Sequence, residues 1–238
     1  MATYTTSGSG DYGRKFSISR ENGTADKNGK PYFFEWLKEL PAEAERKGRK
    51  FETRVNGQGE QRHYELFAAV AGKLTGFEIE KKTIAGTEER WLVLHMTDGP
   101  EDFKIETGKI DGRYSLDIMK RLLDPQFNPN QNLRLSPFAL KDKEDKVIIG
   151  LSAISGMDGK LSAGREKNPR LDGMAQAASA QFKDRVLWDF EPVAEWLFGQ
   201  LEKLVRPQLS SGPEAWPTQA PAERVAESVT IGDDDLPF

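Results

Sequence analysis

Aromatic side chains next to Lys or Arg recur along the predicted strands of this 238-residue chain. Proteins that bind single-stranded nucleic acid stack bases on aromatic rings and neutralise phosphates with Lys and Arg. The clearest pair is Arg90 and Trp91. The strand that begins there places Leu92, Leu94 and Met96 on one face, which we expect to be core, and turns Trp91 to the other face. Trp91 is therefore the strongest stacking candidate.

Other predicted strands carry weaker candidates of the same kind. Tyr64 and Phe67 lie near Arg62, and Phe77 precedes two lysines. The alternative for each ring is an ordinary core position in a strand. The complete set of DNA-binding candidates is Arg62, Tyr64, Phe67, Lys73, Phe77, Lys81, Lys82, Arg90, Trp91, Lys104 and Arg134. A glycine-containing loop is predicted to add a mobile clamp formed by Lys160, Arg165, Lys167 and Arg170.

The residue types that catalysis needs are scarce. The chain contains no cysteine and two histidines, His63 and His95. Thiolate chemistry and a multi-histidine metal centre are therefore excluded. Gly57 and Gly59 lack the rest of a phosphate-binding or dinucleotide-binding motif and are predicted to lie in a hairpin turn. No paired-carboxylate pattern indicates a nuclease, so we expect a protein that is not an enzyme and uses no cofactor or metal.

The predicted elements follow the order of a known architecture. Three strands precede a helix that Ser115 is expected to cap and Pro125 to end, and two strands follow. Gly76, inside the first strand, is predicted to mark a bulge or bend. This is the order of an OB-fold, a five-stranded Greek-key barrel that commonly binds single-stranded nucleic acid. We predict a mainly β fold of the α+β class with an OB-fold core, its strands at 74–82, 90–97, 102–107, 133–138 and 146–151.

Shorter elements surround this predicted core. Four strands are expected before it, at 15–19, 31–36, 50–55 and 62–67. The second is expected to be the returning strand of the first, and the last two are expected to form a hairpin. Residues 156–185 are expected to form a loop, and an amphipathic helix is predicted at 189–206. The predicted organisation is a disordered segment at 1–14, an OB-fold-like DNA-binding domain at 15–206, and a disordered linker with an acidic docking tip at 207–238.

The charge is unevenly distributed along the chain. The net charge is −4, but the segment from Pro207 onward carries six acids and one base and therefore −5, which leaves +1 for residues 1–206. A near-neutral body with an acidic tail does not indicate nucleic-acid binding by charge alone. No run of eighteen apolar residues is present, so we expect no membrane span.

The end of the chain carries the most specific motif. The last six residues are Asp233, Asp234, Asp235, Leu236, Pro237 and Phe238. On a flexible tether, the proline and the ring can enter an apolar pocket while the carboxylates meet Arg or Lys at its rim. This tip resembles that of bacterial single-stranded DNA-binding proteins, in which aspartates precede an aliphatic residue, Pro and a terminal Phe. The resemblance covers these residues and the acidic character of the preceding segment.

The resemblance implies a divergent, bacteriophage-encoded single-stranded DNA-binding protein in the bacterial host cytoplasm. Such a protein is expected to bind single-stranded DNA independently of sequence during replication, recombination or repair. Its tip is expected to recruit replication and repair proteins, and a homo-oligomer is compatible with the sequence. Two alternatives remain open: a protein–protein adaptor that carries the same tip without binding DNA, and an RNA-binding OB-fold protein.

Overall fold

The computed structural model describes residues 14–18, 31–56, 59–84, 86–141, 147–157, 159–182 and 185–210. The two segments predicted to be disordered, 1–14 and 207–238, therefore lie outside the described residues except at their inner ends. Arg14 begins a strand, and residues 207–210 are helical. Within the described part of the chain, no helix is both long enough and apolar enough to cross a membrane.

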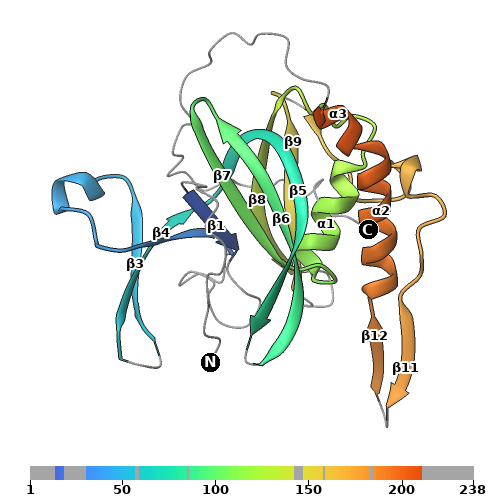
Figure 1. Ribbon diagram of the computed structural model, residues 1–238, viewed down its shortest axis with the longest axis horizontal. Helices are drawn as coiled ribbons and strands as arrows, with labels where there is room; N and C mark the ends of the chain where they lie inside the picture. Colours follow the sequence, from blue (N-terminus) through green and yellow to red (C-terminus); the bar gives the residue numbers. More distant parts are fainter. Residues whose placement is uncertain are drawn as a thin grey trace.

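One large sheet dominates the fold, which is mainly β with a few helices (Figure 1). Its strands are β1 (Arg14–Ile18), β2 (Phe33–Leu37), β3 (Lys50–Val55), β4 (Gln61–Phe67), β5 (Val70–Ile84), β6 (Thr87–Asp98), β7 (Glu101–Lys109), β8 (Asn132–Lys141), β9 (Val147–Ser155) and β10 (Gly159–Lys160). Their hydrogen-bonded order is β10-β9-β8-β5-β6-β7-β1-β2-β4-β3. The strands predicted from the sequence are therefore all present, and most extend a few residues further than expected.

The sheet is not closed into a barrel. β7, the third strand of the predicted barrel, pairs in parallel with β1, so that Phe16 lies beside Ile105. β9, the fifth strand, pairs with the short strand β10. The edges of β7 and β9 that would pair with each other to close a five-stranded barrel are therefore occupied by β1 and β10. β2, β4 and β3 extend the sheet beyond β1 into a separate arm (Figure 1).

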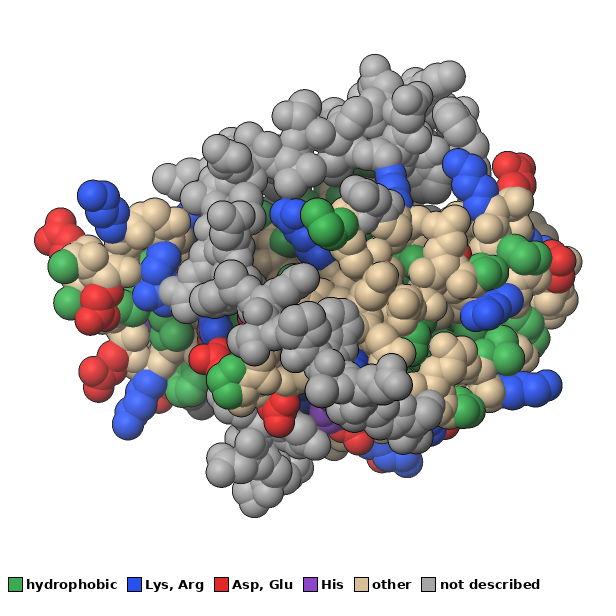
Figure 2. Space-filling model, turned by 90° about the horizontal axis from the view of Figure 1, so that it is seen from above, with side chains coloured by type: hydrophobic (Ala, Val, Ile, Leu, Met, Phe, Trp, Pro, Cys, Tyr) green, Lys and Arg blue, Asp and Glu red, His purple; other side chains and the backbone are tan. Residues whose placement is uncertain are grey.

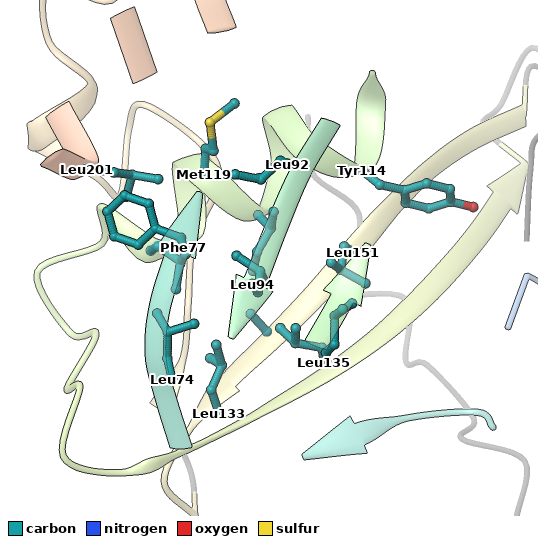
Figure 3. Packing of buried hydrophobic residues seen from close by; sticks show 14 of the residues in the cluster. Leu74, Phe77, Leu92, Leu94, Tyr114, Met119, Leu133, Leu135, Leu151 and Leu201 are labelled. Carbon is teal, nitrogen blue, oxygen red and sulfur yellow. The ribbon is translucent and has the colours of Figure 1, made fainter. Parts of the chain in front are cut away.

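The inner face of the sheet carries the hydrophobic core (Figure 3). Leu92, Leu94 and Met96 on β6 are fully buried, which confirms the predicted core face of that strand. They belong to one cluster with Met119 of helix α1 (Arg113–Leu122) and Leu201 of helix α2 (Glu191–Leu204). α1 and α2 therefore cover this face, and the opposite face of the sheet is called the outer face below.

Two irregularities adjust which residues share a face. The pairing of β5 with β6 shifts between Leu74 and Gly76, as predicted for a bulge at this glycine. The pairing of β6 with β7 shifts between Leu92 and Val93, where β7 contains one additional residue. Gly108, next to this shift, has a backbone φ of 107°, which residues other than glycine rarely adopt. The bulges keep Leu74 and Phe77 on the inner face and bend the long strands.

The helices differ in detail from the sequence expectations. Ser115 does not cap α1, because the N-cap is Gly112 and the Ser115 hydroxyl lies 2.8 Å from Thr107 Oγ1. α2 ends at Leu204, and the short helix α3 (Arg206–Ser210) follows it. Leu209 of α3 packs against the core. The linker predicted to begin at 207 therefore begins with a helical turn. The described residues also include two 3₁₀ helices, η1 (Glu43–Arg46) and η2 (Pro169–Leu171).

The loop predicted at 156–185 contains a separate hairpin instead. β11 (Ala178–Phe182) and β12 (Arg185–Asp189) pair with each other and project away from the body below α2 (Figure 1). Val186, Leu187 and Trp188 are more than half exposed on it. The alanine and serine of β11 have weak strand propensity, so the sequence gives little sign of this hairpin.

Candidate nucleic-acid interface

The strand registers define the residues of the outer face. Directly paired residues of neighbouring strands project from the same face of a sheet. One row of paired positions crosses six strands without a break, from β6 to β3. Its residues are Val93, Glu106, Ser17, Phe34, Leu66 and Lys50. With a spacing of about 4.8 Å between strands, this row is about 24 Å long.

Three aromatic rings gather on the arm end of the outer face, and we call Phe34, Trp36 and Tyr64 the aromatic patch. Trp36 is 57% exposed and lies directly opposite Tyr64. The rings of Phe34 and Tyr64 meet edge to face at 5.5 Å between centroids. The indole of Trp36 therefore presents an open surface beside two partly exposed rings, which is the geometry needed to stack bases.

Two arginines lie beside the aromatic patch. The guanidinium carbon of Arg54 is 5.5 Å from the centroid of the Tyr64 ring. Arg62 is directly opposite Arg54 and forms a long ion pair with Glu60 at 4.0 Å. Phosphates next to stacked bases would meet these positive charges.

Arg54 is held in place by a small polar network. It donates to the Tyr32 hydroxyl at 2.5 Å and to Glu52 Oε2 at 2.6 Å. Burial, with the hydrogen bond to Glu52, raises the pKa of Tyr32 to about 12. The hydrogen bond from Arg54 holds the pKa of Glu52 below its usual value. Tyr32 therefore stays neutral and Glu52 charged at neutral pH, which fixes Arg54 over Tyr64.

Lysines and glutamates alternate over the middle of the outer face. The Glu106 carboxylate, buried at 2% exposure, pairs with Lys15 at 2.5 Å and also with Lys82. Glu80 pairs with Lys104 at 2.8 Å. Burial lowers the pKa of Lys82 although Glu106 opposes that shift. These three lysines and two glutamates together carry one net positive charge, so the attraction of this group for phosphate is weak.

The structure brings most of the predicted DNA-binding residues onto one face. The pairings place seven on the outer face: Arg62, Tyr64, Lys73, Lys82, Trp91, Lys104 and Arg134. The other four, Phe67, Phe77, Lys81 and Arg90, lie on the inner face or at its margin. On the face seen in Figure 2, Lys and Arg side chains are scattered from one end of the view to the other, with acidic side chains beside several of them.

Trp91 lies on the expected face, but it is not open. It is 6% exposed, and its Nε1 donates to Glu89 at 2.9 Å. Lys82 covers it, with Nζ 4.3 Å from the ring centroid. The ring is therefore part of the packing between strands and is not available for stacking in this conformation. Alternation along the strand predicted the face of Trp91 correctly, but the side chain of Lys82 covers the ring on that face.

The four inner-face candidates are engaged within the protein. Phe77 is 1% exposed, and Phe67 packs edge to face on Phe16 at 5.2 Å. Arg90 pairs with Glu191 at 2.6 Å and also with Glu195 at the start of α2. Lys81 pairs with Glu88 at 3.0 Å near the end of the β5–β6 hairpin. Phe77 therefore belongs to the hydrophobic core and Phe67 packs against it, as in the alternative given for these rings above.

Sequence reasoning missed the centre of the aromatic patch. The sequence predicts a strand at 31–36, but the predicted DNA-binding residues do not include Phe34 or Trp36. The available signal was the alternation of side chains along the strand. Phe33 is fully buried on the inner face, so Phe34 and Trp36, one and three residues further along, project from the outer face, and Glu35 projects from the inner face. The pairing of β2 with β4, which places Trp36 beside Tyr64, could not be inferred from spacing.

The predicted basic clamp is fixed to α1. Asn168, fully buried, donates from Nδ2 to the carbonyl of Lys120 at 2.9 Å, and Asp124 accepts from the backbone of Ser162 at 2.6 Å. Lys160, Arg165 and Lys167 are exposed on this loop, and Arg170 is half-buried. The Lys and Arg side chains of this loop therefore project from a backbone that is anchored to the end of α1.

The histidines take part in separate local contacts. His63 Nδ1 lies 2.8 Å from Thr53 Oγ1, and His95 Nε2 lies 2.8 Å from Glu78 Oε1. His95 is on the outer face and His63 on the inner one, so they do not face each other. The predicted docking residues from Asp233 to Phe238 lie outside the described residues. Comparisons of the chain with protein-family models, curated proteins and solved structures found no match.

Proposed function

We propose that this protein binds single-stranded DNA independently of sequence and without catalysis. The observation that carries the proposal is the aromatic patch, in which exposed Trp36 lies opposite Tyr64 with Arg54 held over the second ring. Every base has a π-face, so such a patch binds bases with little sequence preference. Each stacked base contributes about 1–3 kcal/mol.

The lysines beyond the aromatic patch extend the path for the strand. Lys15 and Lys104 lie side by side on β1 and β7, on the same face as Phe34 and Trp36. When phosphates approach, they compete with Glu106 and Glu80 for these lysines. Binding is therefore expected to weaken steeply with added salt, because cations condensed on the strand are released.

We also propose that β5 to β9 with α1 are a modified OB-fold. Support comes from the hydrogen-bonded order β9-β8-β5-β6-β7 and from the position of α1 between β7 and β8 in the chain. In this proposal, β1 and the arm replace the barrel closure and widen the outer face, so that the site moves toward β2 and β4.

The second part of the proposal concerns partner recruitment. The acidic residues with Leu236, Pro237 and Phe238 supply a short epitope for an apolar pocket with a basic rim. We propose that this tip recruits replication and repair proteins, in a bacteriophage-encoded protein that acts in the host cytoplasm. This part rests on the sequence resemblance.

A gel-shift comparison with the full chain tests the binding function and separates the alternatives. The protein is mixed with oligomers of dT, with oligomers of rU and with duplex DNA at low salt. Preferential retention of dT supports the proposal. Preference for rU would identify an RNA-binding protein, and no shift with any of the three would favour the protein–protein adaptor.

A further inference from the structure

A group of positive charges lies at the β10 edge of the sheet, around the end of α1 and the loop that follows β10. We call Lys120, Lys160, Arg165 and Lys167 the basic rim. Lys160, Arg165 and Lys167 are exposed, and Lys120 is half-buried. Burial lowers the pKa of Lys120; Asp117 opposes this shift, and Arg165 contributes to it. Burial also lowers the pKa of Lys160, and Lys167 contributes.

These positive charges are close enough to act on one another: Arg165 acts on Lys120, and Lys167 acts on Lys160. Within the described part of the chain, neither Lys120 nor Lys167 forms an ion pair, and Arg165 donates to the carbonyl of Met174 at 3.1 Å. This contrasts with the outer face, where Lys15, Lys82 and Lys104 all pair with glutamates. A positive charge in the last turn of a helix interacts favourably with the helix dipole. This interaction explains the position of Lys120 in α1, but it does not explain the positions of the loop residues.

The backbone beneath the basic rim is rigidly supported. Leu161 and Leu171 are fully buried at the two ends of the loop and belong to the core cluster. Arg121 donates to the carbonyl of Leu161, and Asn168 joins the carbonyls of Lys120 and Ser162 at 2.9 and 3.4 Å. The fold therefore holds like charges near one another on a fixed backbone, an arrangement that favours the approach of an anionic partner.

The basic rim begins where the outer face ends. Lys160 pairs with Ile154, Ile154 pairs with Arg134, and Arg134 pairs with Ala71. Lys160 and Arg134 therefore share the outer face, with one strand between them. β10 is the terminal strand of the sheet, so Lys160 is at the edge where the outer face meets the loop.

We propose that the basic rim binds the phosphate backbone of a single strand that has crossed the outer face and passes around β10. This inference rests on the proposed function and adds a second contact region to it. The aromatic patch lies near one end of the sheet and the basic rim at the other. Short oligomers occupy the aromatic patch alone, whereas long ones reach both regions.

The test compares two oligomer lengths and two lysine variants of the full chain. The double variant Lys120→Gln/Lys167→Gln removes two charges of the basic rim, and Lys203→Gln, on the exposed side of α2, is the matched control. Affinity for dT oligomers of about 5 and about 30 nucleotides, which bracket the usual site sizes, is measured at several salt concentrations. Lys167→Gln alone, at an exposed position, repeats the test should the double variant unfold.

The expected result is confined to the long oligomer. The double variant binds it several-fold more weakly than the parent, and the slope of log affinity against log salt decreases by about 0.7 for each lost phosphate contact. Its affinity for the short oligomer stays that of the parent, and Lys203→Gln changes neither. Equal salt slopes for the double variant, the control and the parent would overturn the inference. If the parent binds neither oligomer, the proposed function itself fails, which is a different result.

Discussion

Trp36 of β2 lies directly opposite Tyr64 of β4, and Tyr64 in turn lies directly opposite Glu52 of β3. Paired residues in antiparallel strands have Cβ atoms about 4.5–5.5 Å apart and share a face. The indole is therefore fixed next to the phenol ring that Arg54 covers from the other side. The arm formed by β2, β4 and β3 thus combines stacking surfaces and positive charge within three strands.

The buried indole of Trp91 is expected to support the fold. Trp91→Ala should reduce the free energy of unfolding by about 3–5 kcal/mol, because a large buried ring is lost and the Lys82 side chain loses its packing surface. Urea unfolding measures this loss. Trp188→Ala is the control, since Trp188 is 60% exposed on the β11–β12 hairpin and its loss should cost less than about 0.5 kcal/mol. Unchanged stability of Trp91→Ala with weakened DNA binding would return Trp91 to the binding surface.

The role of Trp91 shows how far the sequence alone reaches. Alternation along β6 predicted the core residues Leu92, Leu94 and Met96, and Gly76 predicted the bulge in β5. The two-residue period of a strand predicts which side chains share a face, but whether other side chains cover that face depends on the neighbouring strands. Lys82 of β5 reaches over Trp91, and this contact depends on strand register.

The extension of the sheet was equally hidden in the sequence. The segment 31–36 was predicted as the returning strand of 15–19, and β1 and β2 do pair antiparallel. The pairings of β1 with β7 and of β2 with β4 were not predicted. The parallel pairing of β1 with β7 joins segments almost ninety residues apart. It occupies the edge of β7 on which the barrel would close, and it aligns Ser17 with Glu106. Pairings between distant segments are set by the packing of the whole core, which periodicity does not encode.

Glu52 is expected to restrain DNA binding at the aromatic patch. Its carboxylate holds Arg54 at 2.6 Å. Glu52→Gln should raise the affinity for dT oligomers a few-fold at low salt and steepen the salt dependence by about 0.7, because Arg54 becomes free for one more phosphate. A partly exposed ion pair of this kind contributes only about 0–1 kcal/mol, so folding should persist.

The control for this change is Glu88→Gln, which breaks an exposed pair with Lys81 away from the aromatic patch. Both variants remove one negative charge, so their difference isolates the position of Glu52. If the two variants gain equal affinity, the effect belongs to net charge alone and Arg54 does not contact the strand.

The ion pairs of Glu80 are expected to make stability depend on pH. Burial alone would raise the pKa of Glu80, but the hydrogen bond and charge of Lys104 together with Lys82 lower it overall. A carboxylate with a lowered pKa stabilises the fold above its unfolded-state pKa of 4.5, and this contribution is lost as the pH falls through the folded-state value. Glu80→Gln should therefore melt below the parent at pH 7, and the gap should close near pH 3. A gap of equal size at both pH values would show that the ion pairs are not its origin.

The tip is expected to act separately from the folded body. Deletion of the six residues from Asp233 to Phe238 should leave the melting temperature nearly unchanged and the affinity for dT equal or somewhat higher at low salt, because three aspartates are removed. It should abolish binding to host replication and repair proteins. Phe238→Ala keeps every charge, so DNA affinity should hold while partner binding falls. Undiminished partner binding by Phe238→Ala would refute docking through the tip.

Titration of the full chain with dT oligomers, followed by tryptophan fluorescence, tests the central claim most directly. The parent should show saturable quenching, and Trp36→Ala should lose most of this quenching and about 1–3 kcal/mol of binding free energy while its melting temperature holds. Trp188→Ala, which removes an equally exposed indole elsewhere, should bind like the parent. If Trp36→Ala and Trp188→Ala both bind with the parent's affinity and quenching, the aromatic patch is not the site at which this protein holds single-stranded DNA.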